Sequence, residues 1–375
     1  MKPTRTLIAF VLLCTPTLAA DPAVRYIESD GRVVAAVVPE SAELVHTRQF
    51  LSNDESQDAA ALLHEVKRTV GEFGGDAERL VRVNVVASTQ DVADKARESL
   101  AGIRAPITFV IGALPHGRKL GIDAVAPVTK KPPETTSAAS VLRAGPRLYV
   151  SGQAEKAAKP AEAAAKTIES LVKTIEEFGS NKSAVVQAKC FLTPMSAAPD
   201  VMDEFAKAFG KQKLPLVFVE WKSDLPIEIE LIATAPPAAP DAPAVEYLTP
   251  AGMKPSPVFA RVVRVNRGAL IYTAGLYPEK PGNGEQQVLS VFDQLQRILK
   301  ETGGDMKQLA KATYYVSNDD ASKQLNAIRP KYYDPQRPPA ASKAVVHGVG
   351  MKERSVTIDM IGVMDRSLTT NTIKP

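Results

Sequence analysis

Three stretches of twenty residues share one pattern and decide the fold. They read VGEFGGDAERLVRVNVVAST at residues 70–89, IEEFGSNKSAVVQAKCFLTP at 175–194 and LKETGGDMKQLAKATYYVSN at 299–318. In each stretch a glycine (Gly74, Gly179 or Gly303) is followed six positions later by an aliphatic residue that opens a strand-like run. A pattern that recurs along a chain indicates copies of one supersecondary unit. We therefore predict three related domains of roughly one hundred residues each.

An amphipathic helix is expected before each glycine. Apolar residues recur there at spacings of three and four, for example at Leu63, Val66 and Val70, which places them on one helical face. The glycine after the last turn is a natural helix C-cap. A second helix is expected after each strand, with an aspartate near its N-terminus for capping and for the helix dipole. These second helices are DVADKARESL (residues 91–100), DVMDEFAKAF (200–209) and DASKQLNAIRPKYY (320–333).

Strands open and close every unit. The closing pairs are PITFVIGA with KLGIDAVA, PLVFVEW with IEIELIA, and KAVVHGV with SVTIDMIGV. Apolar and polar residues alternate clearly from Ile227 to Glu230, which is typical of a strand. The predicted fold class is α+β: each unit follows the order β-β-α-β-α-β-β and forms a mixed sheet with two helices on one face.

The repeats and the proline-rich stretches between them set the expected domain boundaries. Both proline-rich stretches are expected to be extended linkers. The expected divisions are a signal peptide at 1–20, a first and most divergent domain at 21–126, a linker at 127–137, a second domain at 138–233, a Pro/Ala-rich linker at 234–257, a third domain at 258–365 and a C-terminal tail at 366–375.

The first twenty residues have the layout of a secretory signal peptide. Lys2 and Arg5 precede an apolar run that is too short to span a bilayer, and small residues follow that run. We expect cleavage near Ala19 or Ala20. The mature protein is then exported, periplasmic or extracellular, with no membrane span.

Charge and cysteine content argue against several classes of function. Cleavage removes Lys2 and Arg5 and lowers the formal charge of +4 by two, which leaves a field too weak to indicate a nucleic-acid partner. It also removes Cys14, so no intrachain disulfide is expected, and Cys190 is predicted to be a buried strand thiol. The four histidines show no metal-ligand spacing, and phosphate-loop, dinucleotide-binding and serine-nucleophile motifs are missing. We expect neither a metal nor a cofactor.

The ordered motifs carry a resemblance to a known family. RLYVSGQ, VVQAKCFLT and IEIELIA in the second unit, and ALIYTAGLYPEKPGNGE, KYYDPQRPPAAS and SVTIDMIGV in the third, resemble the YjgF/RidA family of reactive-intermediate deaminases, formerly called L-PSP endoribonucleases. The resemblance covers nearly all of the mature chain and is weakest in the first unit. It implies RidA-like (chorismate-mutase-like) domains, which assemble as trimers with ligand clefts at the subunit interfaces.

Three copies in one chain imply a monomer that acts as an intrachain pseudo-trimer, because linkage makes the assembly intramolecular. The alternative is three independent domains on a string. That arrangement would expose the apolar inner face of each sheet and is therefore disfavoured.

The family's substrate-binding arginine is missing from every copy. The resemblance implies that this arginine, in a Pro-Ala-Arg-Ser/Thr run, binds the substrate carboxylate, a role that suits a planar guanidinium. Ala341 holds the arginine position in the third unit, Val217 in the second and Pro106 in the first. Deaminase activity of the usual kind is therefore not expected.

The family's second functional residue is a glutamate in the closing strand, implicated in water activation as a general base would be. The second unit retains it as Glu228, whereas Thr357 and Gly121 replace it in the third and first units. Glu228 is the catalytic candidate. The other interpretation is an ordinary glutamate on the exposed face of an alternating strand.

Seven further residues are candidates for ligand binding. They are Tyr149, Ser151, Gln153, Tyr272, Tyr277, Lys343 and Arg104. Lys343 and Arg104 lie two residues from positions assigned to the lost arginine, and are either its substitutes or solvated edge charges. Ser151 and Gln153 belong to a Ser-Gly-Gln signature, which either contacts a ligand or reflects the turn that its glycine permits. The tyrosines either line a cleft or pack with the ring buried.

The sequence favours an exported protein that binds a small molecule in degenerate clefts between its domains. The alternative is an enamine or imine hydrolase of the deaminase type with altered catalytic residues, and a purely structural role is a further hypothesis. Ribonuclease action, which the older family name indicates, lacks a basic and aromatic track. Export argues against the family's usual metabolic role, because the resemblance places reactive enamines with cytoplasmic pyridoxal enzymes.

Overall fold

The computed structural model describes residues 24–52 and 58–365. The predicted signal peptide at 1–20 and tail at 366–375 lie outside these residues. Within them, the strands of the three repeats form three mixed sheets, and two helices accompany each sheet. The α+β fold class predicted from the sequence is confirmed.

Six α-helices occur in the described part of the chain at the predicted places, but the last ends at Ile328 rather than at the predicted Tyr333, and a 3-10 turn follows it at Arg329–Lys331. They are α1 (Ala59–Glu72), α2 (Gln90–Ser99), α3 (Pro160–Glu177), α4 (Ala198–Phe209), α5 (Gly284–Thr302) and α6 (Asp319–Ile328). Gly74, Gly179 and Gly303 have φ values of 75°, 77° and 86° at the ends of α1, α3 and α5. This left-handed conformation ends a helix, and glycine adopts it without a steric penalty.

The N-termini of the second helices differ from the prediction. The side chains of Thr89 and Asn318 cap α2 and α6 by accepting backbone N–H groups of the first turn. The expected capping aspartates, such as Asp91 and Asp320, lie inside the first turn, where they suit the helix dipole. Helix α4 has no side-chain cap.

The three sheets are numbered here by the repeat that supplies their central strands. Sheet 1 has the order β6 (Ile107–Ile111), β5 (Arg82–Ala87), β7 (Leu120–Pro127), β3 (Leu44–Thr47) and β8 (Ala139–Leu142), with β4 (Phe50–Leu51) also paired to β7. Sheet 2 has the order β11 (Leu216–Glu220), β10 (Val185–Leu192), β12 (Ile227–Thr234), β9 (Arg147–Gln153), β14 (Val262–Val265) and β13 (Val245–Leu248). Sheet 3 has the order β1 (Arg25–Ser29), β2 (Arg32–Val38), β15 (Ala269–Thr273), β18 (Val356–Met364), β16 (Leu309–Val316) and β17 (Ala340–Val345).

Each sheet is completed by strands from a different repeat. Strand β2 precedes β3 in the chain but pairs with β15 of sheet 3, where Val38 lies opposite Leu270. Strand β8 precedes β9 but pairs with β3, and β14 precedes β15 but pairs with β9. The sheets therefore cross the domain boundaries expected from the sequence. The Pro/Ala-rich segment at 234–257, expected to be a linker, contains strand β13.

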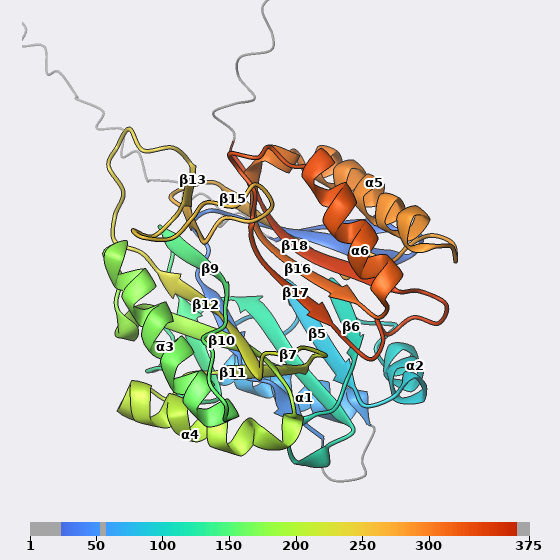
Figure 1. Ribbon diagram of the computed structural model, residues 1–375, viewed down its shortest axis with the longest axis horizontal. Coiled ribbons are helices and arrows are strands. Elements are labelled where there is room, and N and C mark those ends of the chain that lie inside the picture. The colour runs from blue at the N-terminus through green and yellow to red at the C-terminus, as the bar shows by residue number, and fades with distance from the viewer. Residues whose placement is uncertain (1–23, 53–57, 366–375) are drawn as a thin grey trace, which may run out of the picture.

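Helices lie on the outside of the molecule. Figure 1 shows α3 beside α4 and α5 beside α6, each pair on the outer side of its strands. The core between α5, α6 and sheet 3 contains, for example, Phe292, Leu325 and Tyr314. Cys190 is buried in the corresponding core of sheet 2, as predicted, and burial raises the pKa of its thiol.

The opposite faces of the three sheets share one apolar cluster, which we call the inner cluster. It contains Leu44 and Val125 from sheet 1, Tyr149 from sheet 2, and Tyr272 and Val363 from sheet 3, all of them buried. These side chains are shielded from water only while all three sheets are in contact. The hydrophobic effect therefore makes each sheet depend on the other two.

Buried ion pairs also join the sheets. Arg82 of sheet 1 contacts Asp359 of sheet 3 at 2.6 Å, and Lys311 of sheet 3 contacts Glu230 of sheet 2 at 2.7 Å. Burial alone would raise the pKa of Glu230, but Lys311 and Lys189 hold it below its ordinary value. Loss of one partner would leave a buried charge unpaired, which costs about 3–5 kcal/mol. The pairs therefore constrain how the sheets lie against one another.

Candidate functional site

Strands of neighbouring sheets meet at three interfaces, where ligand clefts are expected. At the 2/3 interface, β17 of sheet 3 lies against β9 of sheet 2, and the Ala341 N–H donates to Ser151 Oγ at 2.7 Å. At the 3/1 interface, β6 of sheet 1 meets Gly275, directly beyond β15 of sheet 3. At the 1/2 interface, the Gln49 N–H beyond β3 of sheet 1 donates to the Leu216 carbonyl of β11 at 2.9 Å.

Strand registers correct two of the positions assigned to the family's arginine. The residues nine positions after the repeat glycines pair as follows: Ala312 with Ala341, Ala188 with Leu216 and Val83 with Ile107. The arginine positions of the second and first units are therefore Leu216 and Ile107. Val217 is one residue too late and Pro106 one too early, because neither unit repeats the Pro-Ala-x-Ser run on which a count can be anchored. All three positions are aliphatic, so the arginine is absent from every copy.

Two chain segments approach each other closely at both the 2/3 and the 3/1 interface. At the 2/3 interface Glu228 faces Gly152, and a Cβ on Gly152 would lie 2.0 Å from Glu228 Oε1. At the 3/1 interface Thr357 faces Gly275, and a Cβ on Gly275 would lie 3.1 Å from Thr357 Oγ1. Glycine is required at position 152 because the side chain of Glu228 fills the space that a Cβ would occupy.

At the 1/2 interface the small and the large residue exchange places. Here the facing residue is Gly121, and the large residue is Gln49, whose Cγ would lie 3.1 Å from a Cβ on Gly121. Gln49 Nε2 donates to the Phe218 carbonyl at 3.0 Å, and Gln49 Oε1 accepts from the Phe218 N–H at 3.3 Å. The amide of Gln49 therefore bridges sheets 1 and 2. Gln49 was not predicted as a site residue from the sequence. A signal was present: RLYV and LIYT in the second and third units are followed by Ser151-Gly152 and Ala274-Gly275, whereas LVHT in the first unit is followed by Arg48-Gln49.

Glu228, Ser151 and Lys343 come together at the 2/3 interface, as three of the predicted site residues. The Ser151 hydroxyl donates to the Ala260 carbonyl at 2.5 Å while it accepts the Ala341 N–H. Lys343 Nζ donates to Ser322 Oγ of α6 at 3.1 Å. The ammonium group is therefore held toward the helix and acts on Glu228 only from a distance.

Glu228 has a carboxyl that titrates near neutral pH. Burial disfavours its charged form and raises its pKa from the ordinary value of 4.5 to about 7. Ser342 and Lys343 oppose this shift, and Glu230 adds to it. Burial also lowers the pKa of Lys343. A carboxyl with a pKa near 7 can both accept and donate a proton.

The 2/3 interface retains this proton-transfer group without a guanidinium clamp. Ala341 offers a methyl group at the arginine position, and its N–H is already bound to Ser151. Lys343 is a point charge that cannot reproduce bidentate carboxylate recognition. The chemistry available here is hydrogen bonding and proton transfer at one carboxyl group.

Three of the other predicted ligand-binding residues lie away from any interface cleft. Tyr149 and Tyr272 are fully buried in the inner cluster. Gln153 Nε2 donates to Thr174 Oγ1 of α3 at 2.9 Å, so its side chain points to the helix side of sheet 2. These three side chains contribute to packing in the structure.

Tyr277 and Arg104 line a cavity of about 590 Å³ at the 3/1 interface. The Tyr277 hydroxyl donates to the Phe109 carbonyl at 3.1 Å and accepts the Phe109 N–H at 3.0 Å. Arg104 pairs with Glu28 at 3.2 Å. Both residues therefore stand beside a cavity but already have protein partners.

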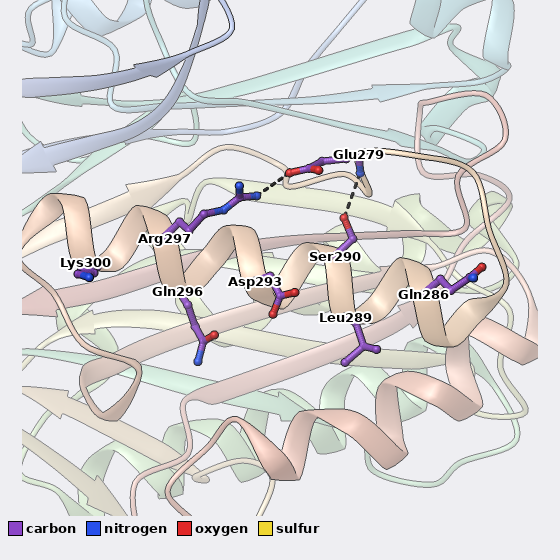
Figure 2. Close-up of a pocket in the computed structure, with 8 residues that line it drawn as sticks. All are labelled: Glu279, Gln286, Leu289, Ser290, Asp293, Gln296, Arg297 and Lys300. Carbon is purple, nitrogen blue, oxygen red and sulfur yellow. Dashed lines mark hydrogen bonds and ion pairs between the residues drawn. The ribbon is translucent and has the colours of Figure 1, made fainter.

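A groove on the outer face of α5 differs from the interface clefts. Figure 2 shows its residues along α5, apart from Glu279, which lies on the preceding loop and is joined to both Arg297 and Ser290. Its wall comes almost entirely from one element and contains paired charges, so we do not place the site there. In residues 24–52 and 58–365, no group of three or more His, Cys, Asp or Glu side chains is arranged to hold a metal ion. No helix within the same ranges is long and apolar enough to cross a membrane.

Gly152→Ala should destabilise the protein on its own and be largely rescued by Glu228→Ala. The added methyl group collides with the Glu228 carboxylate, an overpacking that costs about 1–3 kcal/mol, and truncation of Glu228 removes the collision. Thermal unfolding of the two single variants and the double variant measures the coupling, which we expect to exceed ~1 kcal/mol. Gly71→Ala in α1, where a Cβ meets nothing within 4 Å, is the control. Additive effects would contradict the facing geometry.

Comparison with known proteins identifies a family by sequence. The family profile described as Endoribonuclease L-PSP matches residues 129–235 and 252–364, more than half of the chain. No curated protein matches this chain. Similar solved structures include a YjgF family protein from Neisseria meningitidis (21% identity, 32% of this chain and 95% of that one, TM-score 0.25) and the Rid family protein YyfB from Yersinia pestis (18% identity, 32% and 98%, TM-score 0.28). On the profile match, the chain belongs to the Endoribonuclease L-PSP (YjgF/Rid) family.

Proposed function

We propose that this protein binds a small metabolite in the cleft at its 2/3 interface and has lost arginine-dependent deamination. The observation that carries the proposal is the strand register, which leaves Ala341, Leu216 and Ile107 at the three arginine positions. None of these side chains can bind a carboxylate. Half-buried Glu228 remains at the 2/3 interface as a group that can form hydrogen bonds with a polar ligand.

The proposal includes a pseudo-trimer built from one chain. The resemblance implies that family clefts lie between trimer subunits, and the corresponding positions here lie between sheets of one chain. The exchanged strands and the inner cluster support this arrangement. Export after cleavage near Ala19 or Ala20 is also part of the proposal, supported by the pattern of the first twenty residues.

Hydrolysis of an enamine or imine at the 2/3 cleft is the second candidate function. Glu228 favours it, because a carboxyl with a pKa of about 7 is suited to activate water and to protonate a leaving amine. This function would need the substrate to be held without the arginine. We do not propose ribonuclease action, because the mature chain carries only a weak net charge.

Turnover of freshly generated 2-aminoacrylate separates the two candidates. We expect ammonia release at the buffer rate, together with a rise in Tm for at least one compound of a metabolite panel, since a ligand of the folded state stabilises it. Glu228→Gln should remove that rise, whereas Glu169→Gln, an exposed carboxylate on α3, should keep it. Ammonia release above the buffer rate that is lost in Glu228→Gln would instead establish the hydrolase.

Glu228 should make the protein less stable as the pH rises. Because its folded pKa of about 7 exceeds the ordinary 4.5, the folded state binds the proton more tightly, and the resulting stabilisation is present below pH 4.5 and lost as the pH rises through 7. Glu228→Gln mimics the neutral carboxyl. We expect its Tm to exceed that of the parent at pH 8 and the difference to be much smaller near pH 5. A Tm difference that does not change between these pH values would contradict the raised pKa.

A further inference from the structure

A cavity of about 560 Å³ lies at the 1/2 interface, apart from the 2/3 cleft, and we call it the cationic cavity. This size is within the range of small-molecule sites. Buried Phe218 and half-buried Leu216 of β11 and buried Phe205 of α4 line it. The amide of Gln49, which also lines it, is used up by hydrogen bonds to the Phe218 backbone. The inner wall therefore suits an apolar group.

Several exposed side chains around this cavity are basic. Arg48, Lys213 and His116 are exposed and line it, and no carboxylate lines it among the residues that the structure describes. Within that same part of the chain, neither Arg48 nor Lys213 has an acidic partner. In the 3/1 cavity, by contrast, Arg104 is paired with Glu28. Unpaired cations beside an apolar wall attract an anion more strongly than they would in open water.

The backbone holds two of these residues in an unfavourable conformation. His116 has a φ of 59° and Lys213 a φ of 45°, two of the four positive values found for non-glycine residues in the described ranges. The left-handed region is disfavoured for any residue with a Cβ. Such strain persists where the surrounding structure imposes it, and it concentrates at functional sites. Both strained residues border the same cavity, in the loops after Leu114 and after α4.

We propose that the cationic cavity binds a monocarboxylate with an apolar tail. The carboxylate lies at the opening, near Arg48 and Lys213, and the tail packs inside against Leu216 and Phe218. This orientation is the reverse of the one that the resemblance implies for the family, where an arginine at the position of Leu216 holds the carboxylate. The site does not involve Glu228 and stands independently of the function proposed for the 2/3 cleft.

Isothermal titration calorimetry of the mature chain with sodium decanoate, below its critical micelle concentration, tests the proposal. We expect saturable binding of decanoate and at least tenfold weaker binding of decylammonium, which has the same tail and the opposite charge. Arg48→Gln combined with Lys213→Gln should weaken decanoate binding at least tenfold. Lys211→Gln is the matched control, because Lys211 is an exposed neighbour that does not line the cavity.

A second variant tests the tail site without a change of charge. Ala206 is exposed and lines the cavity, so Ala206→Trp should fill it and weaken decanoate binding at least tenfold. Unchanged thermal unfolding checks that each variant folds, as expected for exposed positions. The proposal is overturned if decanoate does not bind, if decylammonium binds equally well, or if the cavity variants bind like the parent. It is also overturned if Glu228→Gln weakens binding, because the ligand then occupies the 2/3 cleft.

Discussion

Backbone pairing between strands of different repeats holds the three sheets together. Strand β2 pairs with β15, β8 with β3 and β14 with β9, so each repeat both donates a strand and receives one. An unpaired sheet edge exposes a row of N–H and C=O groups, and the exchange satisfies these edges within one chain. The same pairing brings the inner faces together, which buries Tyr149 and Tyr272 and places ion pairs such as Arg82 with Asp359 between sheets.

The three clefts depend on this arrangement because each takes its walls from two sheets. In a homotrimer symmetry would make the clefts identical, whereas one chain allows each to differ. Glu228 places an ionisable group at the 2/3 interface, Thr357 a buried hydroxyl at the 3/1 interface, and Gln49 an amide that bridges the sheets at the 1/2 interface. A pair of facing positions, one small and one large, therefore distinguishes the three interfaces.

Helices, most strands and the repeat were predictable from the sequence because they follow from local pattern. Apolar spacing and a glycine such as Gly303 are enough to place a helix and its end. The partner of a strand is not local information: the continuous apolar run of β2 does not distinguish pairing with β3 from pairing with β15. The exchange was therefore missed, and so was β13 in a proline-rich segment.

The candidate site was predictable only in part, for related reasons. Glu228, Ser151 and Lys343 were proposed separately from motifs, and the structure brings them to one interface because β17 lies against β9 there. Residue counting placed the arginine position at Val217 rather than Leu216, since loop lengths differ between repeats and only the strand register fixes the equivalence. Gln49 was missed because its role arises from contact with Phe218, which is 169 positions away in the chain.

Disulfide trapping tests the strand exchange most directly. Ala35 of β2 lies opposite Thr273 of β15, whereas a local hairpin would place Ala35 opposite Thr47 of β3, the position equivalent to Thr273. Facing residues of antiparallel strands are close enough for a disulfide. In the monomeric fraction of mature protein refolded under oxidising conditions, peptide mapping should find the cross-link in the Ala35→Cys/Thr273→Cys variant and not in Ala35→Cys/Thr47→Cys. The reverse result would show that each repeat keeps its own strand and would contradict the structure on which the clefts depend.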